Sequence, residues 1–489
     1  MVERVNAYST YIGGSILMKR KYRILALMMA LVMLVATFAG CNGSNNPPSS
    51  TGSTGSEGKD DGNDSTPSGE EKVVVFWTHY SDDIAFTQKK VADYNELMAG
   101  QVRVELKHIS DDYNNVLLMA LKNDDGPDLY ANGVDLAQLA QQNYMAPLDD
   151  LMSDEMAARV ADFRQNAINW YDGSWYSLPF RGYNFRLAWN KDMFEAAGLD
   201  PDSPPTTYEE FIEYAQILTE HGSAQSPQQY GFMLPTGEDW IWWIYGMQMA
   251  RVNGDSYYDY TTGEFTWEAF KPVMEMYLTL KENNSLFPGG TTMENDPARA
   301  QFSAGNVGMI IAASWDIGVF NDQFPAEIEW DVAELPNIDG ERHGYPQLDA
   351  GSYLHINAGS SVKQEAMDFY EYLLSEEVLI EYYEEGYGIP VYDSIAQKAS
   401  KTPDRPGFAG FADVSNDRMY AYEPPVQVEG QGYGSVMNDV MNGAVDIDTA
   451  IADLNARYNA AIEAGVANGD FAIEDYIIPG YSTLNPLGN

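Results

Sequence analysis

Cysteine is almost absent from this 489-residue chain, which contains only Cys41. With one thiol, no disulfide can form within the chain and no thiolate metal site can be built. The five histidines are scattered and lack the spacing of a metal site. The motifs of a nucleophile elbow, a zinc protease and a P-loop are absent as well. We therefore expect a protein that is not an enzyme, binds no metal and needs no cofactor.

Positive charge is also scarce. The chain has 28 Lys and Arg against 73 Asp and Glu, a formal net charge of −45 at pH 7. Residues 1–40 carry five basic and one acidic side chain, a net of +4, so the remaining residues carry −49. A surface this acidic repels phosphate backbones and anionic headgroups, so no nucleic-acid partner is expected.

Cys41 stands at the end of an apolar leader. A cationic segment at 18–23 is followed by apolar residues at 24–38 and by two small residues. This pattern is typical of an export signal that starts at Met18, and its junction resembles a bacterial lipobox. We expect residues 1–40 to be the signal peptide and Cys41 to carry lipid, which would anchor the protein to the cell membrane outside the cytoplasm. A transmembrane anchor is the alternative, but the apolar stretch is shorter than the roughly 20 residues that a span prefers.

A tether follows the leader. Residues 42–69 are Gly, Ser, Thr, Asn, Pro and charged residues, without an aliphatic or aromatic side chain. Such a segment cannot offset the entropy cost of ordering, so 41–70 is predicted to be a disordered tether. The residues from 71 onward are too many for one compact core and are enough for two domains.

The rest of the chain alternates strand and helix patterns. Continuous apolar runs at 73–77 and 307–313 are typical of buried strands. Helices are predicted over 82–98 and over 240–249. This alternation predicts an α/β fold with a parallel or mixed sheet covered on both faces.

Ligands bind such sheets at the carboxyl ends of the strands. This rule selects the loops after Trp77 and after Ala131, which carry Tyr80, Asp82 and Asn132. The alternative for Asp82 is that it caps the helix that follows.

The order of short motifs along the chain is its most specific signal. They occur at 126–130 (GPDLY), 146–150 (APLDD), 172–179 (DGSWYSLP), 189–198 (WNKDMFEAAG), 205–211 (PTTYEEF), 305–309 (GNVGM) and 388–390 (GIP). In this order they resemble the extracellular solute-binding proteins of bacterial ABC transporters, in the sugar-binding group that includes maltose-binding protein. The resemblance extends from about 72 to 465.

The resemblance implies a two-lobed, periplasmic-binding-protein-like fold of type II, with a ligand cleft between lobes joined by a hinge. The amino-terminal lobe would hold 71–183 and about 295–345. The carboxyl-terminal lobe would hold 184–294 and about 346–489. The protein would be a monomer that closes around its ligand and delivers it to the permease of an ABC importer.

Aromatic side chains make up 13% of the chain, which favours a carbohydrate ligand. An oligosaccharide presents hydroxyl edges and apolar ring faces, so its site needs flat aromatics beside polar groups. The segment 239–243 (DWIWW) supplies both, and on a helix Trp240 and Trp243 would share one face while Trp242 points elsewhere. Packing within the core is the alternative for each tryptophan.

The strand at 307–313 ends directly before Trp315 and Asp316, which would place both at a cleft. The full set of side chains expected to bind the carbohydrate is Tyr80, Asp82, Asn132, Arg181, Asp239, Trp240, Trp243, Trp315, Asp316 and Tyr353.

Three other functions remain open from the sequence. A surface glycoside hydrolase would use a pair of the abundant carboxylates. A solute-binding protein for a ligand other than a sugar would share the leader and the fold. A lipoprotein that binds another protein would expose a large apolar patch instead of a cleft.

Overall fold

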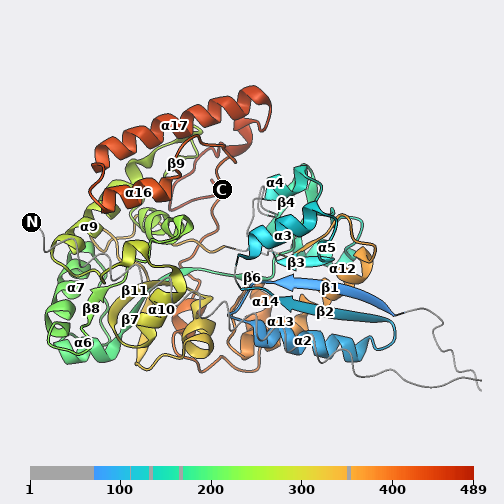
Figure 1. Ribbon diagram of the computed structural model, residues 1–489, viewed down its shortest axis with the longest axis horizontal. Coiled ribbons are helices and arrows are strands. Elements are labelled where there is room, and N and C mark those ends of the chain that lie inside the picture. The colour runs from blue at the N-terminus through green and yellow to red at the C-terminus, as the bar shows by residue number, and fades with distance from the viewer. Residues whose placement is uncertain (1–70, 111, 132–135, 165–168, 350–353, 489) are drawn as a thin grey trace, which may run out of the picture. The chain divides into compact units, whose positions relative to one another are not determined.

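The computed structural model describes residues 71–110, 112–131, 136–164, 169–349 and 354–488 (Figure 1). These residues belong to one compact unit, Pro67–Asn489. The expected signal peptide, the tether and Cys41 lie outside the described residues, as do Asn132 and Tyr353. In the described part of the chain, none of the helices combines the length and the apolar character that crossing a bilayer requires.

The first sheet has four strands in the order β13-β3-β1-β2. Strands β2 and β3 run parallel to β1, and β13 is antiparallel to β3. The strands are β1 (Lys72–Thr78), β2 (Val102–His108), β3 (Leu129–Ala131) and β13 (Leu354–Ile356). The predicted strand at 73–77 and the predicted helix at 82–98 are confirmed, the latter as α2 (Ile84–Leu97).

Helices cover this sheet because their apolar residues meet those of β1. The ring of Phe369, on α12 (Lys363–Leu373), lies 6.0 Å from the ring of Phe76 on β1 and 5.0 Å from that of Tyr94 on α2. The same core includes Val74 and Leu129. Since Phe369 follows the first strands by more than two hundred residues, a distant segment of the chain completes this core.

The second sheet is mixed and has the order β12-β7-β11-β8. Strand β7 is antiparallel to β11 and β12, and β8 is parallel to β11. The strands are β7 (Phe185–Asn190), β8 (Tyr230–Phe232), β11 (Val307–Ala313) and β12 (Trp330–Ala333). All seven residues of β11 are buried, as predicted from the apolar run at 307–313.

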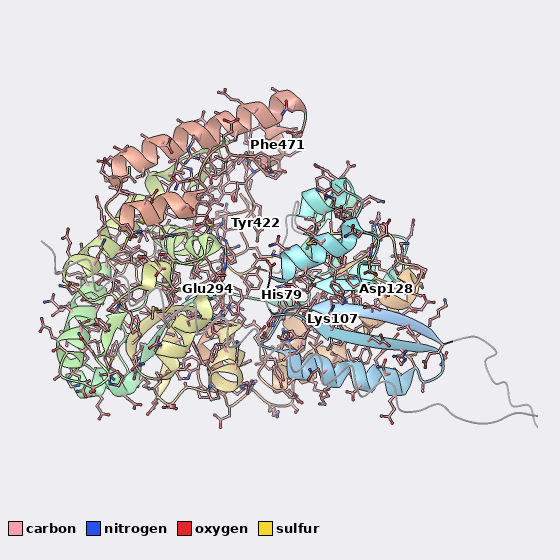
Figure 2. All side chains as sticks on the ribbon, in the orientation of Figure 1. His79, Lys107, Asp128, Glu294, Tyr422 and Phe471 are labelled. Atoms are coloured by element: carbon pink, nitrogen blue, oxygen red, sulfur yellow. The ribbon has the colours of Figure 1, made fainter. Side chains whose placement is uncertain are left out.

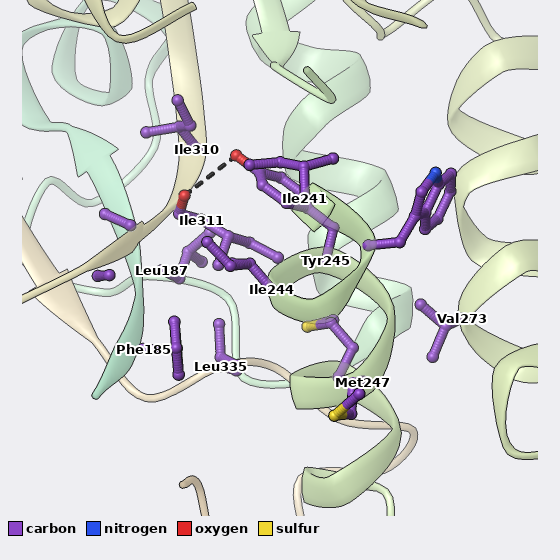
Figure 3. Packing of buried hydrophobic residues seen from close by; sticks show 14 of the residues in the cluster. Phe185, Leu187, Ile241, Ile244, Tyr245, Met247, Val273, Ile310, Ile311 and Leu335 are labelled. Carbon is purple, nitrogen blue, oxygen red and sulfur yellow. Dashed lines mark hydrogen bonds between the residues drawn. The ribbon is translucent and has the colours of Figure 1, made fainter. Parts of the chain in front are cut away.

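The segment that leads into the short helix α8 (Met249–Val252) packs on this sheet (Figure 3). The hydroxyl of Tyr245 donates a 3.0 Å hydrogen bond to the carbonyl of Ile311 on β11. Further helices surround the same core: α7 (Tyr208–Gly222), α9 (Lys271–Glu282), α16 (Tyr433–Met441) and α17 (Ile447–Asn468).

We call residues 71–180 and 354–388, around the first sheet, the first lobe, and residues 185–347 and 391–488, around the second sheet, the second lobe. This allocation differs from the expected one at two places: about 295–345 was expected in the amino-terminal lobe, and 354–388 in the carboxyl-terminal lobe. Strands β11 and β12 pair with β7, and β13 is the late strand that joins the first sheet. Burial accounts for the position of β11. Its residues are all apolar and buried, and it lies between β7 and β8 in the interior of the second sheet.

Candidate ligand-binding site

The loop after β1 begins with His79 and Tyr80, whose rings are in contact at a tilted angle. The imidazole of His79 lies 4.5 Å from the ring of Tyr80 and 4.6 Å from that of Tyr113 on α3 (Tyr113–Lys122). Figure 2 shows His79 at the carboxyl end of β1. Burial lowers the pKa of His79 to about 4, so the ring is neutral at pH 7.

Arg181 joins this loop to the short strand β6 (Arg181–Gly182), which pairs with β14 (Ile389–Pro390). Its Nη1 donates to the carboxylates of Asp82 at 2.6 Å and Asp83 at 3.1 Å, and to the hydroxyl of Tyr382 at 2.8 Å. The guanidinium also lies 5.1 Å from the ring centre of Tyr80. The structure therefore brings Tyr80, Asp82 and Arg181 together, as the ligand-site prediction requires; we call these residues with Asp83 and Tyr382 the Arg181 cluster.

The Arg181 cluster is buried, and its charges depend on one another. The exposed fractions are 14% for the Arg181 side chain, 12% for Asp82 and 4% for Asp83. Burial raises the pKa of Asp83 to about 6, although the charge of Arg181 opposes this rise. Burial would lower the pKa of Arg181, but the Asp82 and Asp83 carboxylates outweigh burial and raise it. The cation is thus already neutralised within the protein.

Aromatic rings gather at the end of β11, where Ala313 pairs with Phe185 of β7. The ring of Trp315 lies 5.0 Å from Tyr183 and 6.0 Å from Phe185, both edge to face. The ring of Trp243 lies 4.9 Å from Phe185 and 6.1 Å from Tyr183. Trp243 and Trp315 are only half-buried, so part of each ring surface is open to a ligand. We call these four residues the aromatic cluster.

Asp316 follows Trp315 but has partners inside the protein. One carboxylate oxygen lies 2.6 Å from Nη2 of Arg299, and the other accepts the backbone N–H of Ala313 at 2.8 Å. The residue is 4% exposed, and burial raises its pKa although Arg299 opposes the rise. These contacts hold the turn after β11 and thereby the position of Trp315.

The segment 239–243 is helical, as expected, but it is not a regular α-helix. It begins as a 3-10 helix at Asp239–Ile241 and continues as a π-helix at Trp243–Gln248, so the α-helical spacing does not apply. Trp242 is fully buried, and its Nε1 donates to Asn438 at 3.2 Å. Trp240 is 43% exposed.

The carboxylate of Asp239 accepts hydrogen bonds from the hydroxyl of Ser435 at 3.0 and 2.9 Å. Among the expected residues of 239–243, Trp243 is the one that these ring contacts place in the aromatic cluster.

The Arg181 cluster and the turn after β11 meet at a glycine. A Cβ atom on Gly318 would lie 2.5 Å from the carbonyl oxygen of Asp82, so no larger residue fits there without a shift of the backbone. Gly318 ends the helical turn that Asp316 begins. The loops that follow β1 and β11 are therefore in direct contact.

Sequence reasoning missed two contributors, Tyr382 and Phe185. Tyr382 stands on α13 (Glu376–Glu384), 201 positions from Arg181, and nothing in its local pattern marks it as a partner. Phe185 begins a fully buried strand, and its place beside Trp315 follows from the pairing of β7 with β11.

The family model for the bacterial extracellular solute-binding proteins matches residues 79–380, more than half of the chain. The chain belongs to this family. It is therefore an extracellular solute-binding receptor and not an enzyme, as expected from the sequence.

Relatives and solved structures agree with this assignment. The sn-glycerol-3-phosphate-binding periplasmic proteins UgpB of Brucella melitensis and Rhizobium meliloti are 25% and 24% identical to this solute-binding protein, over 60% and 61% of its chain and 69% and 70% of their own.

An ABC transporter solute-binding protein of Thermotoga lettingae, bound with α-D-tagatose, superposes with a TM-score of 0.64 at 21% identity, covering 80% of this chain and 99% of that one. The maltose-maltodextrin-binding protein of Alicyclobacillus acidocaldarius gives 0.60 at 18% identity, covering 79% and 100%. The predicted α/β fold of the periplasmic-binding-protein type is confirmed.

Proposed function

We propose that this solute-binding protein is a lipid-anchored receptor that captures a carbohydrate, an oligosaccharide, and delivers it to the permease of an ABC importer. The aromatic cluster carries the proposal. It offers half-buried rings beside the buried polar groups of the Arg181 cluster, which is the combination that a sugar ring requires.

The choice between a sugar and a phosphate ester depends on the state of Arg181. A phosphate ligand needs a cation that is free to pair with it. Arg181 already contacts the carboxylates of Asp82 and Asp83, so its charge is neutralised. The UgpB relatives bear the name of a phosphate ester, whereas the structural neighbour from Thermotoga lettingae is bound with a sugar, α-D-tagatose. The Arg181 cluster favours the neutral ligand.

Binding on this proposal proceeds by closure of two rigid lobes. The chain passes between the lobes at β6 and β14, which pair with each other, and the backbones of Tyr183 and Asp349 form a further bridge. A ligand that contacts the loops after both β1 and β11 stabilises the closed arrangement over the open one. Of the expected ligand contacts outside the two clusters, Asn132, Asp239, Trp240, Asp316 and Tyr353 remain part of this proposal.

The deciding experiment is a thermal-unfolding screen of the purified protein against a panel of mono- and oligosaccharides, with sn-glycerol 3-phosphate as the comparison ligand. A cognate sugar at 100 Kd stabilises the fold by about 2.7 kcal/mol. Stabilisation by glycerol phosphate together with no response to any saccharide would overturn the carbohydrate assignment and leave the receptor assignment intact.

The lipid anchor is tested separately at Cys41. The wild-type protein, expressed in a bacterium that processes lipoproteins and grown with an alkyne-tagged fatty acid, should carry the label and sediment with membranes. Cys41→Ser should lose the label and appear in the soluble fraction outside the cytoplasm. An unlabelled wild type that still sediments with membranes would show that the apolar leader itself is the anchor.

A further inference from the structure

The second lobe carries a pocket of about 470 Å³ away from both clusters. Its volume lies within the range of small-molecule sites, about 300–1,000 Å³. Four parts of the lobe line it: the end of α7, the start of β8, the turn after α9 and the end of α16. The lining includes Gln228, Tyr230, Asn284, Phe287, Thr291 and Asn442.

The apolar wall of this pocket is an aromatic pair held by backbone hydrogen bonds. The rings of Tyr230 and Phe287 meet edge to face with centres 5.4 Å apart. The segment that contains Phe287 runs beside the edge strand β8, since the N–H of Phe287 donates to the carbonyl of Phe232 at 2.9 Å. This pairing fixes the wall before any ligand arrives.

The polar side of the pocket has unused hydrogen-bonding capacity. Within the described residues, the side chains of Gln228, Asn284, Thr291 and Asn442 make no hydrogen bond to protein groups, and together they provide both donors and acceptors. The one cation of the lining, Lys281, donates its Nζ to the carbonyl of Met441 at the end of α16.

The chemistry of the lining argues against metal, amine and anionic ligands. A metal or amine ligand would need carboxylates, and none lines this pocket although the chain has 73 Asp and Glu. An anion would compete with the carbonyl that already holds Lys281. Three amides, a hydroxyl and a pair of aromatic rings instead suit a neutral ligand with hydroxyl edges and an apolar ring face, which is the chemistry of a pyranose.

The pocket and the aromatic cluster lie at opposite ends of β11. Tyr230 of the pocket pairs with Val307, the first residue of β11, while Trp315 follows its last residue. Val307 and Trp315 are eight positions apart, roughly 25 Å along an extended strand. A molecule bound in the pocket would not contact the aromatic cluster.

We infer that this pocket is a second carbohydrate-binding site, which holds one or two sugar units on the second lobe independently of the ligand site at the strand ends. Such a site would keep a longer glycan near the receptor while its end is captured. The inference goes beyond the proposed function and does not depend on it, because the pocket has its own lining.

The test uses the full chain and counts sites. Isothermal titration and saturation-transfer NMR with glucose, mannose, xylose and their disaccharides should reveal a weak binding event in addition to any tight one. The double variant Asn284→Ala/Asn442→Ala should weaken the weak event at least 10-fold and leave the tight one unchanged. Trp315→Ala should weaken the tight event and leave the weak event unchanged.

The control double variant Gln88→Ala/Asn114→Ala removes two exposed amides of the first lobe, and both events should persist in it. Absence of the weak event for every sugar in the panel would overturn the inference. So would a weak event that the Asn284→Ala/Asn442→Ala variant leaves unchanged. A wild-type protein that shows the weak event but no tight event would count against the proposed function and not against the pocket.

Discussion

The loop after β1 and the turn after β11 both stand at the carboxyl ends of sheet strands. They differ in how many of their side-chain groups already have partners within the protein. In the Arg181 cluster, one guanidinium holds two carboxylates and a hydroxyl, so its charges have partners before a ligand binds. In the aromatic cluster, Trp243 and Trp315 keep part of their ring surface free. The first should therefore control stability and its pH dependence, and the second should control affinity.

The largest expected effect is on stability, from Arg181→Met. Removing the cation leaves Asp82 and Asp83 buried without their partner, which costs about 3–5 kcal/mol in the free energy of unfolding. Urea unfolding at pH 7 measures the loss. Arg103→Met is the matched control, because Arg103 also pairs with two carboxylates but is 44% exposed, and its loss of stability should be much smaller than that of Arg181→Met. Equal losses in the two variants would refute the difference between buried and exposed pairs.

The next effect is on affinity, from Trp315→Ala. Loss of a stacking anchor should weaken binding of the cognate sugar by about 2–4 kcal/mol. Calorimetry gives the loss, and solution scattering should show that the variant no longer compacts at a ligand concentration that compacts the wild type. Normal affinity combined with a lower unfolding temperature would identify Trp315 as a core residue.

A smaller effect, on the pH dependence of stability, should distinguish Asp83 from His79 in the loop after β1. The pKa of Asp83 is raised to about 6 in the folded protein, so its contribution to stability is complete below about 4 and is lost as the pH rises through 6. Between pH 4 and 7, the unfolding free energy of wild type minus that of Asp83→Asn should fall by up to about 3 kcal/mol.

His79 provides the control with the opposite sign. Its folded pKa of about 4 lies below the ordinary value, so its contribution is present above pH 6.5 and is lost as the pH falls through 4. The wild-type minus His79→Gln difference should rise over the same pH range. If both variants shift the pH profile in one direction, burial does not set these two pKa values.

The smallest effect on stability should come from Trp240→Ala. With 43% of its surface exposed, Trp240 should change the unfolding free energy by no more than about 0.5 kcal/mol. Its neighbour Trp242 is fully buried and should cost about 3–5 kcal/mol when replaced by alanine. Any loss of affinity in Trp240→Ala should be smaller than in Trp315→Ala; an equal loss would add Trp240 to the aromatic cluster.

Local patterns predicted the elements of the fold well. The apolar runs at 73–77 and 307–313 correspond to β1 and β11, because an uninterrupted apolar stretch of that length is stable only as a covered strand. The sheet to which each strand belongs was harder to predict. The allocation of about 295–345 to the amino-terminal lobe failed to anticipate the pairing of β11 with β7, which depends on residues more than a hundred positions apart.

The candidate site could be predicted only in part, for the same reason. Capping of the next helix was the alternative for Asp82, but the N-cap residue is Asp83, which makes no capping hydrogen bond and instead pairs with Arg181, 98 positions away. The helical region expected at 240–249 is present, but it is 3-10 and π-helical before α8, so the α-helical spacing of its tryptophans does not hold. Nothing local in the sequence marks this change of helix type, and the contact between Asp83 and Arg181 joins residues far apart in the chain.

The edge-to-face contact between Trp315 and Tyr183 also has an optical consequence. An indole that is half-buried emits at a wavelength that depends on how much water touches it, and a bound ligand on its free face would exclude that water. On the proposed function, the emission of Trp315, one of ten tryptophans in the chain, should therefore move to the blue as the receptor fills. Capture of a solute could then be followed in real time without attaching a dye.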